Sequence, residues 1–121
     1  MKLLIVDDSE LIRTRLIGLF DGIPGIEAIH TAVTLAQTLE SVRRVLPTLV
    51  ILDLHFPDGN AIPIINTIKV LAPGVQIAML SNDASEFNRR KCLVIGADWF
   101  FDKSTEFESL LEAVREQAGR N

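Results

Sequence analysis

The stretch Thr48-Leu49-Val50-Ile51-Leu52-Asp53 decides the fold. Its four consecutive aliphatic residues are too few for a helix, and Pro47 and Pro57 bound the segment on either side. A short continuous apolar run of this kind predicts a central strand that is buried on both faces of a sheet. Asp53 ends the run, and turn residues follow it up to residue 59. We therefore expect the Asp53 carboxylate at the end of a buried strand, where a loop begins.

Three other apolar runs along the chain also end in polar residues. Because the carboxyl ends of parallel strands meet at one edge of an open sheet, these polar groups would converge where such folds bind their ligands. The runs are residues 3–6 before Asp7 and Asp8, residues 75–80 before Ser81, and residues 99–102 before Lys103. We expect the aspartates, the hydroxyl group and the lysine to share one edge of the sheet.

Segments with helical periodicity separate the apolar runs. A further strand over residues 26–31 is interrupted by Glu27 and His30, which predicts a half-exposed edge strand. The fivefold alternation of strand and helix predicts an α/β fold, a doubly wound five-stranded parallel sheet with helices on both faces. The expected helix caps are Ser9, Thr34 with Gln37, Asn60, Asp83 with Glu86, and Thr105 with Glu108.

The helix expected over residues 84–95 differs from the others. Its first two turns offer little apolar surface beyond Ala84 and Phe87, and Arg89, Arg90 and Lys91 lie in its middle. A weakly buried segment can open or shift at a low cost in free energy. We expect this helix to be one of the elements that move most easily.

Length, composition and charge exclude several classes of protein. The chain has 121 residues, 48% of them hydrophobic, enough for one domain whose core needs no disulfide or metal. A net charge of −4 argues against direct binding of nucleic acid. The single Cys92 fits a reducing compartment, and Asp7 and Asp8 cut the first apolar run too short for a signal peptide. We expect one cytoplasmic domain over residues 1–121, without membrane insertion.

Asp7, Asp8 and Asp53 would place three carboxylates together at the sheet edge. Like charges this close raise one another's pKa values and destabilise a fold unless a cation compensates them. An all-oxygen, partly hydrated site suits Mg²⁺ better than zinc. Lys103 adds an ammonium group and Ser81 a hydroxyl, which could hold a tetrahedral anion. These groups together indicate transfer of a phosphoryl group onto a carboxylate.

The chain resembles the receiver domain of bacterial two-component response regulators, of the stand-alone single-domain type, over essentially its whole length. Asp7 and Asp8 match the family's acidic pair, Asp53 its phosphoacceptor, Ser81 its hydroxyl residue and Lys103 its invariant lysine. The resemblance implies a flavodoxin-like (βα)5 fold with strand order 2-1-3-4-5. Two spacings support it, namely Pro57 four residues after Asp53, and Gly96-Ala97-Asp98 before residues 100–103.

The resemblance also implies how the site would bind its cofactor. Mg²⁺ would be held by Asp8, Asp53, the backbone carbonyl of His55 and water, with Asp7 acting at least partly through water. The side chains of His55 and Asp83 lie two residues beyond the phosphoacceptor and the hydroxyl residue. In the family, side chains at these places flank the path of the hydrolytic water. We therefore expect both residues to modulate the lifetime of the phosphoryl group.

Two residues would form the family's switch. Ser81 would move toward the phosphoryl oxygens, and the space that it leaves would admit Phe100, which occupies the family's switch-aromatic position. One departure from the family pattern lies close by, because Ser104 stands where many members have a proline preceded by a cis bond. A cis bond to a residue other than proline costs about 3 kcal/mol, so the sequence leaves this geometry open.

A histidine kinase or a histidine phosphotransfer protein would donate the phosphoryl group. The output would pass to a downstream protein or a second copy, because the last helix runs to the end of the chain and leaves no linker to an effector domain. The expected face comprises the helix from residue 84, the strand over residues 99–102 and the helix from residue 105. The residues expected to make contact are Arg89, Arg90, Lys91 and Trp99.

Two other kinds of function stay open at this point. The first is an enzyme on the same architecture, either a flavin protein or an aspartate-nucleophile phosphatase. A flavin protein needs a phosphate loop where Asp7 and Asp8 would repel a phosphate, and the phosphatases place an Asp-x-Asp pair there. The second is a receiver-like scaffold that is never phosphorylated, which is disfavoured because every site residue is present. We expect a signalling domain and not a turnover enzyme.

Overall fold

The computed structural model of the chain describes residues 1–120. In this part of the chain, strands and helices alternate as expected from the sequence, and two additional short strands occur in the middle. The elements are β1 (Lys2–Val6), α1 (Glu10–Phe20), β2 (Ala28–Ala32), α2 (Leu35–Val45), β3 (Leu49–Leu52), β4 (His55–Phe56), β5 (Gly59–Asn60), α3 (Ile62–Leu71), β6 (Gln76–Ser81), α4 (Glu86–Ile95), β7 (Trp99–Asp102) and α5 (Phe107–Ala118).

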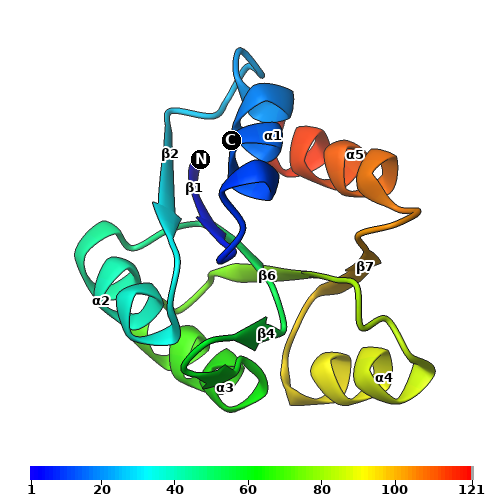
Figure 1. Cartoon of the computed structure of the whole chain (residues 1–121). Helices are drawn as coiled ribbons and strands as arrows, with labels where there is room; N and C mark the ends of the chain where they lie inside the picture. Colours follow the sequence, from blue (N-terminus) through cyan, green and yellow to red (C-terminus); the bar gives the residue numbers. More distant parts are fainter. Residues whose placement is uncertain (121) are drawn as a thin grey trace.

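Five strands form one parallel sheet in the order β2-β1-β3-β6-β7. Counted along the chain without the two short strands, this is the order 2-1-3-4-5, so the predicted fold class is confirmed. All four residues of β3 are buried in the centre of the sheet, as expected from their aliphatic run. β2 and β7 lie at the two edges (Figure 1). The half-exposed edge strand is therefore also confirmed, although β2 begins two residues later than predicted.

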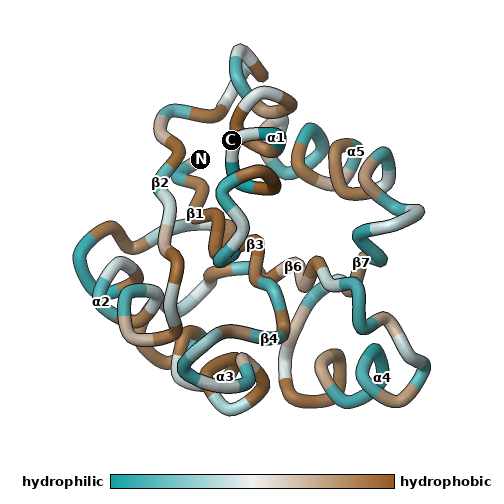
Figure 2. Tube along the Cα trace, viewed as in Figure 1, coloured by the Kyte–Doolittle hydropathy of each residue, from teal (hydrophilic) through white to brown (hydrophobic). Residues whose placement is uncertain are grey.

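Helices cover both faces of the sheet (Figure 1). α1 and α5 pack on one face, against a core that includes Leu3 and Ile51. α2, α3 and α4 cover the other face, against a core that includes Leu4 and Val50. Side chains alternate between the two faces along each strand, so neighbouring residues enter different cores. Figure 2 shows the hydrophobic residues concentrated along β1 and β3. No helix among residues 1–120 is long and apolar enough to cross a membrane.

Two of the predicted helix caps form as the sequence indicated. The Ser9 side chain accepts a hydrogen bond from the backbone N–H of Ile12 at the start of α1. The Thr34 side chain accepts one from the backbone N–H of Gln37 at the start of α2. Each bond satisfies one of the N–H groups that have no partner inside a helix.

The caps predicted for α4 and α5 are wrong. Ser85 caps α4 by accepting from the N–H of Asn88, and Asp83 lies outside the helix. At α5 the cap position is Glu106, and its side chain makes no capping bond. At α4, the carboxylate of Asp83 instead contacts His55, which is distant in the sequence. At α5, the helix begins one residue later than a cap at Thr105 requires, so the predicted pair of Thr105 and Glu108 does not cap it.

The loop predicted after β3 contains a small hairpin, in which β4 pairs with β5. Asn60 ends this hairpin, and its side chain accepts from the N–H of Ile62, which is the first residue of α3. The predicted cap is therefore off by one residue, because Ala61 occupies the cap position and Asn60 precedes it. Pro63 stands within the first turn of α3, where its missing N–H costs nothing.

Candidate functional site

The carboxyl ends of β1, β3, β6 and β7 surround a cleft of about 680 Å³. β1 ends level with β3, where Val6 pairs with Leu52, and β6 ends level with β7, where Ser81 pairs with Asp102. β6 extends two residues beyond β3, because Leu52 pairs with Met79. This register places the polar residues that follow each strand side by side. The predicted site residues that line the cleft are Asp7, Asp8, Asp53, His55, Ser81, Asp83 and Lys103.

Three carboxylates form the acidic part of the cleft. Asp7, Asp8 and Asp53 each offer an oxygen atom within 4.8 Å of the others. Asp53 is 8% exposed and Asp7 is buried as well, whereas Asp8 is exposed to solvent. Backbone N–H groups orient the two buried carboxylates. Ser9 N donates to Asp7 Oδ1 at 2.9 Å, and Leu54 N donates to Asp53 Oδ1 at 2.7 Å.

Lys103 supplies the cation among these carboxylates. Its Nζ lies 2.7 Å from Asp7 Oδ2 and 2.8 Å from Asp53 Oδ2. Burial raises the pKa of the Asp53 carboxyl, although its hydrogen bond with Lys103 opposes the rise. Burial alone would lower the pKa of Lys103, but its hydrogen bonds and ionic contacts with Asp53 and Asp7 raise it above its usual value. The single ammonium group of Lys103 contacts two buried carboxylates but offsets only part of their negative charge, so the cluster stays negative.

The donor atoms fit the predicted metal. Carboxylate oxygens are hard ligands that suit Mg²⁺, and the exposed carboxylate of Asp8 leaves room for coordinated water. The excess negative charge that Lys103 leaves uncompensated is the charge that a divalent cation would neutralise. Among residues 1–120, no other group of three or more Asp, Glu, His or Cys side chains has a spacing that would hold a metal ion.

Ser81, His55 and Asp83 also line the cleft. Ser81 is buried, and its Oγ accepts a hydrogen bond from the N–H of Asp83 at 3.0 Å. The ring of His55 lies with Nε2 2.7 Å from Asp83 Oδ2. This contact joins the loop after β3 to the loop after β6 at the rim of the cleft. Sequence spacing placed both residues near the site, but it gave no sign that they pair with each other.

Phe100 is already inside the protein in this structure. Its ring is 4% exposed and belongs to the core beneath α3 and α4. The expected entry of this ring into space vacated by Ser81 therefore starts from a buried position and not from an exposed one. Trp99, next to it on β7, points to the other face and packs in the core beneath α1 and α5. The Lys103–Ser104 bond is trans, like every peptide bond in residues 1–120.

Two arginines near the site make contacts that the sequence did not predict. Arg13 of α1 donates to the backbone carbonyl of Asp7 at 2.8 Å. Arg89 of α4 donates to the backbone carbonyl of Phe100 at 2.7 Å and to Glu106 Oε1 at 3.0 Å. The sequence predicted Arg89 as a contact residue for a partner and indicated no role for Arg13. Only the folded arrangement reveals the carbonyl groups that these guanidinium groups reach.

Comparisons with known proteins agree with this geometry. Protein-glutamate methylesterase/protein-glutamine glutaminase of Treponema denticola is 32% identical over 111 residues, which are 90% of this chain and 30% of that protein. The chain thus spans less than a third of that relative's length.

Two solved structures have the same fold. A CheY-like response regulator receiver domain protein from Methanospirillum hungatei JF-1 superposes with a TM-score of 0.85 and 26% identity, over 98% of this chain and 94% of that one. A response regulator from Burkholderia pseudomallei, solved with a phosphorylated aspartic acid, a calcium ion and citrate, gives a TM-score of 0.83 and 25% identity, over 98% and 69%. The family model for the response regulator receiver domain matches residues 3–115. The chain belongs to this receiver domain family.

Proposed function

We propose that Asp53 is the residue of this receiver domain that accepts the phosphoryl group, from a histidine kinase or a histidine phosphotransfer protein. The observation that carries the proposal is the position of Asp53 at the end of the central strand, 2.8 Å from Lys103 Nζ and within 4.8 Å of two further aspartates. The relative from Burkholderia pseudomallei, which carries a phosphorylated aspartic acid, supports it.

The reaction forms one bond to phosphorus and breaks another. A carboxylate oxygen of Asp53 attacks the phosphorus of a phosphohistidine, the phosphorus–nitrogen bond breaks, and the imidazole keeps the electron pair and takes up a proton from solvent. Lys103 Nζ, which contacts Asp53 before the reaction, turns to a phosphoryl oxygen. The hydroxyl of Ser81 donates to another phosphoryl oxygen. Fixed donors of this kind stabilise charge in the transition state at little cost in reorganisation.

The acidic residues prepare the cleft for the cofactor. Asp8, Asp53 and the backbone carbonyl of His55 would hold Mg²⁺, with Asp7 acting at least partly through water. When bound, the ion neutralises the charge on the phosphoryl oxygens. Without such compensation, the carboxylates of Asp7 and Asp8 would repel the phosphoryl group. The same repulsion argues against a flavin phosphate at this position, and no comparison supports that alternative or a phosphatase.

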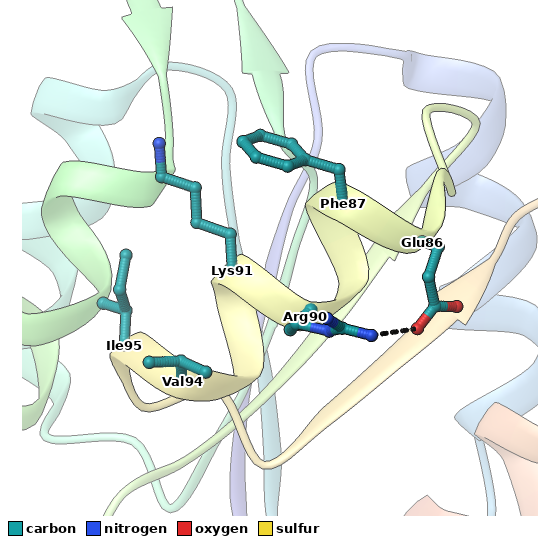
Figure 3. A pocket seen from close by; sticks show the side chains of 6 residues that line it. All are labelled: Glu86, Phe87, Arg90, Lys91, Val94 and Ile95. Atoms are coloured by element: carbon teal, nitrogen blue, oxygen red, sulfur yellow. Dashed lines mark ion pairs between the residues drawn. The ribbon is translucent and has the colours of Figure 1, made fainter.

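The outer side of α4 is the surface that we propose for the output. Figure 3 shows Phe87, Lys91 and Val94 projecting from α4, while Arg90 pairs with Glu86 on the helix surface. Phe87 is 70% exposed and Val94 is 80% exposed. Large apolar side chains among charges mark surfaces that bind proteins, here a downstream protein or a second copy.

Two residues of the expected face do not belong to this outer surface. Arg89 turns inward to Phe100 and Glu106, and Trp99 is packed toward α1 and α5. The proposed surface is therefore narrower than the one expected from the sequence, and it centres on α4. A signalling role of this kind needs no turnover of a separate substrate.

Incubation with a small phosphodonor and Mg²⁺, followed by intact-mass measurement, tests the function. Wild type should gain one phosphoryl group, Asp53→Asn should gain none, and chelation of Mg²⁺ should prevent labelling of wild type. Circular dichroism should show that Asp53→Asn keeps its fold. Full labelling of Asp53→Asn would contradict the assignment.

A further inference from the structure

We propose that Arg89 and Glu106 are positioning residues for phosphoryl transfer, because together they fix the end of β7 from which Lys103 reaches Asp53. The proposal rests on the proposed function of the cleft and adds two residues that do not line it. Neither residue is expected to contact the phosphoryl group. Both would act through the backbone on either side of Phe101.

The two side chains form a closed set of contacts on β7. Arg89 donates from one nitrogen to the carbonyl of Phe100 at 2.7 Å and from the other to Glu106 Oε1 at 3.0 Å. The same Glu106 oxygen accepts from the backbone N–H of Asp102 at 3.0 Å. The guanidinium carbon of Arg89 also lies 5.2 Å from the centre of the Phe100 ring. Both charged side chains are about one-third exposed, so water screens the pair only in part.

The position of β7 explains why these contacts are needed. β7 is an edge strand, and the backbone groups of an edge strand that point away from the sheet have no partner strand. Lys103 N donates to Ser81 O at 3.0 Å and so points into the sheet. Because backbone groups alternate along a strand, the N–H of Asp102 and the carbonyl of Phe100 point to the open side. Glu106 and Arg89 supply the partners that a sixth strand would have supplied.

Lys103 follows directly from this anchored segment. Its backbone is held on the sheet side by Ser81 and on the open side, one residue earlier, by Glu106. Its Nζ must lie within 2.8 Å of both Asp7 and Asp53, so a small outward shift of the strand end would move the ammonium group off its partners. Misplacing a reacting group by about 1 Å can cost on the order of a hundredfold in rate. The Arg89–Glu106 pair therefore controls the rate of transfer through the placement of Lys103.

The test compares phosphorylation rate constants at a saturating concentration of a small phosphodonor with Mg²⁺ dissociation constants from calorimetry. Arg89→Ala and Glu106→Ala should each lower the rate constant by about tenfold. Their Mg²⁺ dissociation constants should stay within about twofold of wild type, since the proposed ligands follow β1 and β3 and not β7. The double variant, which carries both Arg89→Ala and Glu106→Ala, should react no more slowly than either single variant, because the two residues act as one unit.

Conservative variants keep the test decisive if an alanine variant folds poorly. Glu106→Gln retains an oxygen that accepts from Asp102 and Arg89, so its rate constant should stay close to that of wild type. Arg89→Lys offers one nitrogen for two contacts and should fall between wild type and Arg89→Ala. As a matched control, Arg44→Ala and Glu40→Ala break an exposed ion pair on α2 and should leave the rate constant unchanged.

The outcomes separate this proposal from the proposed function. If wild type gains no phosphoryl group, the proposed function fails. If wild type is labelled and folded Arg89→Ala and Glu106→Ala react as fast as wild type, only the positioning role fails. An equal loss of rate and of Mg²⁺ affinity in both variants would show a general structural defect and would also overturn it.

Discussion

At the scale of single residues, the cleft holds more negative charge than its one ammonium group compensates. Asp7 and Asp53 are both buried, and Lys103 lies between them. Burial raises the pKa of Asp53, which means that ionised Asp53 is less favourable in the folded protein than in the unfolded chain. Such a site destabilises the fold, and binding of a cation offsets that loss of stability.

Replacement of Asp53 by asparagine should therefore stabilise the metal-free protein. Because burial raises the pKa of Asp53 in the folded protein, the carboxyl destabilises the fold progressively as pH rises from its ordinary pKa through the raised one. Asp53→Asn should raise the free energy of unfolding in chelator. Urea titrations at pH 7 would measure it, with the exposed Glu112→Gln as an unaffected control. In saturating Mg²⁺, the gain in free energy of unfolding of Asp53→Asn over wild type should shrink or reverse. An equal gain with chelator and with Mg²⁺ would show that uncompensated charge is not its cause.

The contact between His55 and Asp83 should control the lifetime of the phosphoryl group. At 2.7 Å the pair bridges two loops at the rim of the cleft, so breaking it should admit water more readily. We expect His55→Ala and Asp83→Ala each to speed autodephosphorylation several-fold, and the double variant to match the single ones because the two side chains act as a pair. Loss of the phosphoryl mass over time would measure the rates. Unchanged autodephosphorylation rates in both single variants would show that this pair does not control the lifetime of the phosphoryl group.

At the scale of elements, the sequence predicts buried strands better than helix ends. The prediction of β3 is correct because a short run of four aliphatic residues is stable in the middle of a sheet, where both faces are buried. The predicted caps are wrong at α4, where Asp83 lies outside the helix, and at α5, where Glu106 and not the predicted Thr105 takes the cap position. Asp83 binds His55, 28 residues away, and Glu106 binds Arg89, 17 residues away. Neither partner is visible in the local pattern on which capping rules depend.

α4 should tolerate truncation of its outer side chains. One residue of α4, Cys92, is buried, whereas Phe87 is 70% exposed. Phe87→Ala should change the free energy of unfolding by less than about 0.5 kcal/mol. Ile68→Ala in α3, which removes a fully buried side chain, should cost about 2–5 kcal/mol. Urea titrations at two protein concentrations would measure both. A large, concentration-dependent loss for Phe87→Ala would show that a second copy covers this face of α4.

At the scale of the whole molecule, the sheet brings together residues that are far apart in the chain. Lys103 and Asp53 are separated by 50 residues and meet at 2.8 Å because β7 and β3 end at the same edge. The sequence could predict this meeting, since polar residues after apolar runs converge in any parallel sheet. It could not predict how α4 connects to the cleft, because that depends on Arg89 reaching a carbonyl of β7. The connection lies in the packed structure and not in a motif.

This connection predicts how phosphorylation reaches α4. A phosphoryl mimic such as beryllofluoride should draw Ser81 and Lys103 toward it, and the α4 segment should respond because it is lightly buried. Amide hydrogen exchange with and without the mimic should change most at residues 81–95 and 99–103. In Arg89→Ala the change at residues 86–95 should become smaller than in wild type, while the change at residues 53–59 should persist. Changes confined to residues 53–59 in wild type would mean that phosphorylation does not reach α4, and the output surface proposed there would be wrong.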